Sequence, residues 1–172
     1  MKLTLALSAL CLMTASVAGC SSEDDPAEKT EKTGPVAATP LTGSIEGKAF
    51  EAKSAIARKG FEDGEKSIDI YDTAVTCKDF SPKAQRKILI SVPWTAGTNR
   101  DFNFSLSGGD SQTATFVIHE NESDTTQNII STEGRVEIIE APSEPGAMGK
   151  IRLRAVASGN NVEGEIAVEV CD

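Results

Sequence analysis

The stretch KILISVPW, residues 87–94, shows the alternation that decides the fold. Large apolar side chains occupy every second position, and lysine, leucine and serine lie between them. Because successive side chains of a β-strand point to opposite faces, this alternation predicts a strand with one buried face. The members of that face are Ile88, Ile90, Val92 and Trp94.

The same alternation recurs in further runs on both sides of this stretch, separated by turn-forming Gly, Asn and Asp residues. The apolar sets are Ile68 with Ile70, Phe102 with Phe104 and Leu106, and Ala114 with Phe116 and Ile118. The best helical candidate is a single turn at Ser81–Gln85. Short strands at intervals of roughly ten residues are typical of sandwiches and barrels. The sequence therefore predicts an all-β domain, an antiparallel β-sandwich or barrel of about eight to nine short strands.

The end of the chain predicts a hairpin with its turn centred on Gly159 and Asn160. An antiparallel ribbon with one solvated face needs apolar pairs on one side and opposite charges on the other. The expected pairs are Leu153 with Ile166, Ile151 with Val168, Arg154 with Glu165, and Lys150 with Glu169.

The chain before this domain falls into two parts. The apolar run Leu3–Val17 is shorter than the roughly 20 residues of a membrane-spanning helix and fits the core of a signal peptide. Residues 21–40 are rich in Ser, Thr, Pro and charge, with Val36 as the only large aliphatic side chain, which predicts a solvated tether. The expected organisation is a signal peptide at 1–19, a tether at 20–40 and the all-β domain at 41–172.

The quartet VAGC, residues 17–20, resembles the lipobox of bacterial lipoproteins. The resemblance implies cleavage between Gly19 and Cys20, and lipidation of Cys20 with acyl chains such as palmitate. Each buried methylene contributes about 0.8 kcal/mol, so more than one chain gives stable membrane anchoring. Because Ser21 replaces the aspartate that tends to retain Gram-negative members in the inner membrane, the resemblance implies the outer membrane in such a cell. An ordinary signal peptide with a chance cysteine is the alternative.

The folded part is similar only to uncharacterised bacterial lipoprotein domains that share the first-strand pattern GSIEGK, here Gly43–Lys48. That similarity implies no activity.

The sequence has four cysteines, of which Cys11 lies in the predicted signal peptide and Cys20 in the lipobox. The remaining pair, Cys77 and Cys171, predicts a disulfide in an oxidising exported compartment. A zinc site is the alternative, but widely spaced cysteines with a single histidine suit it poorly.

The sequence contains no recognisable catalytic constellation, metal site or cofactor motif. A net charge of −9 argues against nucleic-acid binding. His119, the only histidine, is expected at the surface of a strand end. The acidic residues of His119–Asp124 could ligate calcium, although a solvated turn is the commoner explanation. The segment Phe61–Lys66 is expected to be a plain hairpin turn.

Trp94 and Tyr71 are the only tryptophan and tyrosine. Two interpretations of Trp94 are open. It is either a core residue that closes a strand end or, with Tyr71, part of a platform on which a glycan or other ligand stacks. The main hypothesis is a non-enzymatic binding or structural module at the cell envelope, with an envelope protein or glycan as partner. A carboxylate-based envelope hydrolase is a further alternative.

Overall fold

The computed structural model describes residues 34–79, 84–104, 111–119 and 126–172. This described part contains eleven strands in one sheet and no helix, which confirms the all-β prediction. The strands are β1 (Thr42–Ile45), β2 (Lys48–Glu51), β3 (Ser54–Lys59), β4 (Glu65–Tyr71), β5 (Arg86–Pro93), β6 (Asn99–Asp101), β7 (Ala114–His119), β8 (Thr126–Ser131), β9 (Glu133–Glu140), β10 (Met148–Ala157) and β11 (Asn160–Val170).

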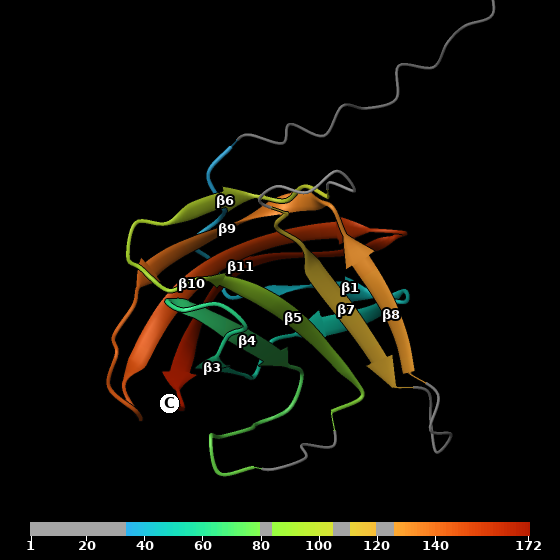
Figure 1. The fold of residues 1–172 in the computed structure, drawn as a ribbon. Coiled ribbons are helices and arrows are strands. Elements are labelled where there is room, and N and C mark those ends of the chain that lie inside the picture. Colours follow the sequence, from blue (N-terminus) through green and yellow to red (C-terminus); the bar gives the residue numbers. More distant parts are fainter. Residues whose placement is uncertain (1–33, 80–83, 105–110, 120–125) are drawn as a thin grey trace, which may run out of the picture.

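Nine strands form the main path of the sheet, in the order β6-β9-β10-β11-β3-β4-β5-β7-β8. The hairpin of β1 and β2 is attached to it through β11. Neighbours are antiparallel except β11 and β3, which run parallel, so the sheet is mixed. The sheet curls into a half-barrel, and β7 and β8 turn back toward β9 and β10 (Figure 1).

A buried serine fixes the corner where β8 continues into β9. Ser131 is 0% exposed, and its hydroxyl accepts a hydrogen bond from the Val156 amide at 3.1 Å. The same hydroxyl lies 2.9 Å from the carbonyl oxygens of Val156 and Glu133, and its single proton can serve one of them at a time. These bonds tie the end of β8 to β10 and hold the sheet in its curl.

The concave face of the sheet carries the main hydrophobic core. The alternation in residues 87–94 is confirmed, because Ile88, Ile90 and Val92 are fully buried there and Trp94 packs against them. Large side chains from the other strands complete this core, among them Phe50, Ile68, Ile70, Phe116, Ile118, Ile138, Ile151 and Leu153. Removing this apolar surface from water is the main stabilising contribution to the fold.

The final hairpin forms, but the predicted register is wrong by two residues. Ile151 lies opposite Ile166 rather than Val168. The turn consists of Ser158 and Gly159, with φ of 49° and 79°, so it begins one residue earlier than predicted. Such a left-handed pair matches the twist of the flanking strands. An even shift leaves each side chain on its predicted face, so the core prediction survives while the partners change.

The predicted strand containing Phe102 and Phe104 is also wrong in part. β6 ends at Asp101, and Asn103 forms an isolated bridge with Gln112. Phe102 is 5% exposed, whereas Phe104 is 56% exposed, so they do not share a buried face. Leu106 and most of the expected turn at Ser81–Gln85 lie outside the described residues.

Candidate functional site

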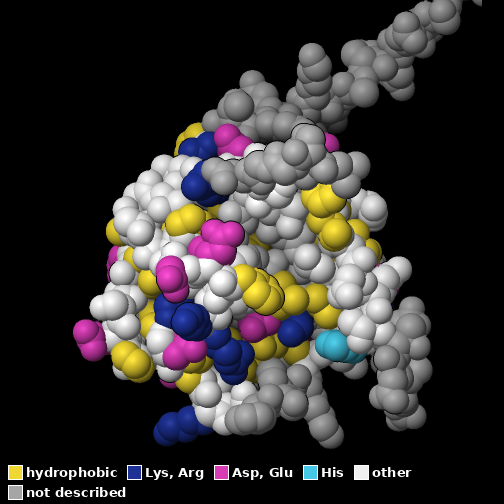
Figure 2. Space-filling view, in the orientation of Figure 1, with side chains coloured by type: hydrophobic (Ala, Val, Ile, Leu, Met, Phe, Trp, Pro, Cys, Tyr) yellow, Lys and Arg dark blue, Asp and Glu magenta, His cyan; other side chains and the backbone are white. Residues whose placement is uncertain are grey.

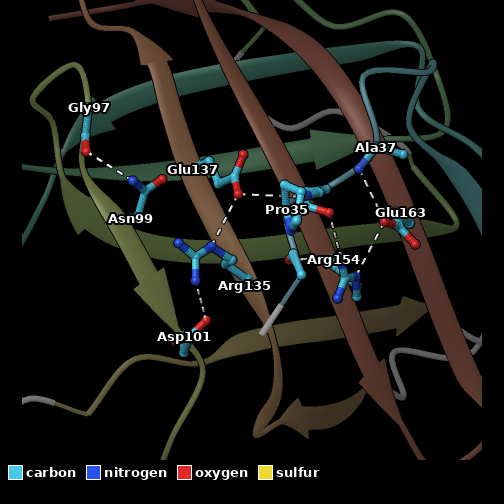
Figure 3. Close-up of polar contacts among 11 residues, drawn as sticks. Pro35, Ala37, Gly97, Asn99, Asp101, Arg135, Glu137, Arg154 and Glu163 are labelled. Carbon is cyan, nitrogen blue, oxygen red and sulfur yellow. Dashed lines mark hydrogen bonds and ion pairs between the residues drawn. The ribbon is translucent and has the colours of Figure 1, made fainter. Parts of the chain in front are cut away.

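Residues 34–41, here called the N-terminal arm, cross the convex face of β9, β10 and β11. Arg154 donates to the carbonyl oxygens of Gly34 at 3.2 Å and Pro35 at 2.9 Å. The amide of Val36 donates to Glu137 at 3.3 Å, and that of Ala37 donates to a carboxylate oxygen of β11 (Figure 3). Because Val36 is 3% exposed, packing begins before residue 41, the boundary expected from the sequence.

Buried charge holds the arm in place. Glu137 is 7% exposed, and the oxygen that accepts from the arm also accepts from Arg135 Nε at 3.1 Å. Arg135 in turn donates to Asp101 at 2.9 Å, and Arg154 pairs with Glu163 at 3.3 Å. A buried carboxylate needs such partners, since removing one would leave an uncompensated charge. The arm is therefore part of the folded domain.

The arm passes closest to the sheet at a glycine of β11. A Cβ on Gly164 would lie 2.5 Å from the carbonyl oxygen of Pro40. On either side of this crossing, the backbone amide of Glu165 donates to the Thr39 carbonyl oxygen at 2.6 Å, and the Glu165 carbonyl oxygen accepts from the Leu41 amide at 3.0 Å. A side chain at position 164 would thus push the arm off the sheet.

Cys77 and Cys171 lie at disulfide distance, with 2.07 Å between their sulfur atoms and 5.2 Å between their Cα atoms. They flank a second hydrophobic cluster, separate from the main core, whose members are Ile56, Tyr71, Val75 and Ala84. Within the part of the chain that the structure describes, no three or more His, Cys, Asp or Glu side chains are grouped so that they could hold a metal ion.

Tyr71 and Trp94 are not brought together. In the β4–β5 pair, Tyr71 lies opposite Lys87 at one end. Pro93, the residue before Trp94, lies at the other end. Tyr71 is 2% exposed in the second cluster, while Trp94 packs against the main core and donates to the Pro142 carbonyl at 2.8 Å. This geometry fits the core interpretation of Trp94 and gives no shared stacking platform.

The single tyrosine provides a probe of this second cluster. Desolvation raises the pKa of Tyr71, the charge of Asp69 raises it further, and Arg58 opposes both. Ion pairs join Asp69 to Arg58 and Lys87 on the convex face, where charges of both signs gather over β3–β5 (Figure 2).

We expect the phenol of native Tyr71 to ionise at higher pH than in the urea-unfolded chain. Because the folded pKa is the higher one, its stabilising contribution is complete below the ordinary tyrosine value and is lost as pH rises toward the folded value. The phenolate absorbance of the native and unfolded protein measures both midpoints. Equal midpoints would contradict the burial of this side chain.

A polar hollow of about 240 Å³ lies between the β3–β4 turn, the end of β5 and β6. Its lining consists of Glu62, Glu65, Pro93, Arg100, Asp101, Asn103, Ser111 and Gln112. Gln112 is 8% exposed and donates to the Ser91 carbonyl at 2.8 Å, which fixes the floor. Two exposed phenylalanines adjoin lining residues in the chain: Phe61 precedes Glu62 and is 98% exposed, and Phe104 follows Asn103.

The remaining predicted positions lie at the surface or outside the description. His119 is exposed at the end of β7, as expected, with its ring nitrogen 3.1 Å from the Thr126 hydroxyl. The segment Phe61–Lys66 includes the turn between β3 and β4, again as expected. The possible calcium ligands after His119, and Gly19 and Cys20, lie outside the described residues.

Neither the arm contacts nor the hollow was predicted from the sequence. A signal for the first was present, since Val36 is an isolated aliphatic residue in a polar segment. No signal in the sequence indicated the hollow, because its lining comes from separate segments that only the curled sheet brings together.

No protein-family model, curated protein or solved structure matches the chain. Among the described residues there is no helix long and apolar enough to cross a membrane.

Proposed function

We propose that this chain is an exported lipoprotein, anchored through Cys20, whose β domain is a non-enzymatic binding or structural module at the cell envelope. The observation that carries the proposal is the order of an apolar run, the quartet VAGC at 17–20 and a polar segment. The packed arm supports it, because it gives that polar segment a defined attachment on the domain at residue 34.

The length and charge of the connecting segment suit this role. Residues 21–33 comprise thirteen positions between the proposed anchor and the arm. Thirteen residues reach at most about 43–47 Å when fully extended, so the domain stays close to its membrane. The acidic residues Glu23, Asp24 and Asp25 would be repelled by an anionic lipid surface. In a Gram-negative cell, we place the anchor in the outer membrane.

Replacing Cys20 by serine is expected to abolish lipid attachment completely. Metabolic labelling with an alkyne palmitate analogue should mark the unaltered chain and leave Cys20→Ser unlabelled, with its signal peptide retained. Cys11→Ser is the matched control, because it removes a thiol from the segment that cleavage discards. Label that persists in Cys20→Ser would refute the proposed anchor.

The polar hollow supports a second candidate function, the binding of a small polyhydroxylated ligand such as a glycan end. Carboxylate and amide groups offer hydrogen bonds in orientations that suit hydroxyl groups, and exposed rings offer apolar contact. Phe61, at 98% exposure, has no packing role that would explain a phenylalanine there. This moves the expected ligand site away from Tyr71, to a hollow whose lining includes Pro93, the residue before Trp94.

Two lining carboxylates have protein partners. Asp101 pairs with Arg135 at 2.9 Å, and Glu65 accepts from the Ser91 hydroxyl at 3.1 Å. A hydrolase needs a positioned pair of carboxyl groups, one of them able to give up a proton. We therefore propose binding rather than hydrolysis for this hollow.

A glycan array with the intact protein tests this candidate. For any glycan that binds, we expect Phe61→Ala and Glu62→Gln each to raise the dissociation constant at least about fivefold. That change corresponds to a loss of roughly 1 kcal/mol of binding free energy. Met148→Ala is the control, since Met148 is an exposed apolar residue that does not line the hollow. An array without binding, or equal affinity in Phe61→Ala, would exclude a glycan site here.

A further inference from the structure

The two edges of the sheet differ in how they are protected. β6 is three residues long and includes the charged Arg100 and Asp101, features that discourage pairing with another chain. β8 is six residues long with the sequence TQNIIS, and it has neither charge nor proline. Its pairing with β7 runs without a register shift, so no bulge twists it away.

The outer edge of β8 is open within the part of the chain that the structure describes. β7 is its only strand partner there, and contact with β10 is made at the Ser131 end. Residues 126–128 are exposed, and Ile130 is 54% exposed. The surface over β8 shows apolar and uncharged atoms, in contrast to the charged area over β3–β5 (Figure 2).

We propose that β8 is a dimerisation strand, which pairs antiparallel with β8 of a second copy and continues the sheet across a two-fold axis. Unpaired amide and carbonyl groups of an edge strand give such pairing its affinity. A net charge of −9 gives two copies a long-range electrostatic repulsion. An uncharged edge is where they can approach at least electrostatic cost.

Side-chain alternation restricts the register of this pairing. A continuous sheet keeps both apolar faces on one side, so opposed residues must have the same parity. Ser131 is committed to Val156 of β10, which leaves residues 126–130 for the partner. The register that uses all of them is centred on Asn128. It places Asn128 opposite its own copy and Thr126 opposite Ile130.

The pairing also accounts for the exposed isoleucine. Ile130 lies on the convex face opposite Thr115 of β7, away from the main core. In the proposed dimer its outer side is covered by the partner strand, where an aliphatic side chain beside threonine is a favourable cross-strand pair.

Co-capture of two differently tagged full-length chains, expressed together and extracted in mild detergent, tests the proposal. The unaltered chains should co-purify, and Asn128→Lys in both copies should reduce co-capture about tenfold because two like charges meet at the axis. Pairing Asn128→Lys with Asn128→Glu should restore it. Asn99→Lys, which adds the same charge to the exposed start of β6, should leave co-capture unchanged.

The remaining outcomes are decisive against the dimerisation strand. Unaltered chains that fail to co-purify would overturn it, including the case in which β8 receives an extended peptide of another protein. Co-capture that persists in Asn128→Lys, with native tryptophan fluorescence intact, would place any self-association elsewhere. The charge-swap pair separates true pairing from chance trapping in one micelle, since micelles do not distinguish these variants.

Discussion

Replacing both Cys77 and Cys171 by serine is expected to lower the free energy of unfolding by about 4–5 kcal/mol. The two cysteines are separated by 94 positions, so their link closes a long loop of the unfolded chain. In the chain-entropy account, a longer loop gives a larger loss of unfolded-state freedom and hence a larger stabilisation. This is a large fraction of the stability of an ordinary domain.

Urea denaturation of the oxidised chain, the reduced chain and the double serine variant measures the effect. Reduction should shift the midpoint of the unaltered chain toward that of the variant, and it should leave the variant itself unchanged. A thiol assay on the unreduced, denatured mature protein should find neither Cys77 nor Cys171 reactive. Two reactive thiols would show that the link does not form, whatever the proximity of the sulfur atoms.

The same variant should loosen the second hydrophobic cluster before the main core. The half-buried Cys77 and Cys171 pack against that cluster, which contains Tyr71. We expect the pKa of Tyr71 to fall toward the ordinary tyrosine value in the variant, because desolvation is the first cause of its elevation. The phenolate titration thus distinguishes a local loss of packing from a purely unfolded-state effect.

Gly134→Ala has the second large expected effect, a loss of about 2–6 kcal/mol in the free energy of unfolding. Gly134 has φ of 134°, a backbone conformation that residues with an L side chain rarely adopt. A Cβ there would overlap the Arg154 carbonyl oxygen of β10. Backbone strain contributes about 1–3 kcal/mol and overpacking a further 1–3 kcal/mol or so. The position follows the β8–β9 corner, so the strain falls where the sheet curls.

Two other glycines separate these causes. Gly97 has φ of 86° with open space around it, so Gly97→Ala should cost only about 1–2 kcal/mol. Gly43 has no positive φ, but its Cβ would meet the backbone of Asn161 and Val162, so Gly43→Ala should cost about 1–3 kcal/mol. If urea midpoints of Gly134→Ala and Gly97→Ala coincide, the close approach to Arg154 has no energetic weight.

The fold class was predictable because alternation is a local property of the chain. Ile88, Ile90 and Val92 occupy the buried face that their spacing indicates. The parallel contact between β11 and β3 was not predictable, since nothing local to Glu169 or Ile56 specifies that they become neighbours. Strand order depends on the free energy of the whole sheet, and a single sequence displays it only through short-range turns.

The hairpin shows the limit of pattern reasoning at finer scale. Apolar and charged residues alternate identically in registers that differ by two, so the pattern could not choose between them. The choice came from Ser158, which adopts a positive φ that sequence statistics reserve mainly for Gly, Asn and Asp. The arm was hidden for a related reason: Arg154 and Glu137 look like ordinary surface charges until the chain crosses them.

The crossing of the arm has a mechanical consequence for a tethered domain. A pull applied through the segment before residue 34 reaches Arg154, Val36 and Glu137 first. These bonds join the arm to two different strands, β9 and β10, and the load passes to β11 at Glu163 and Glu165 before it reaches β1. Tension is thus spread across three strands of the sheet, and β1 is shielded from being peeled away from its end.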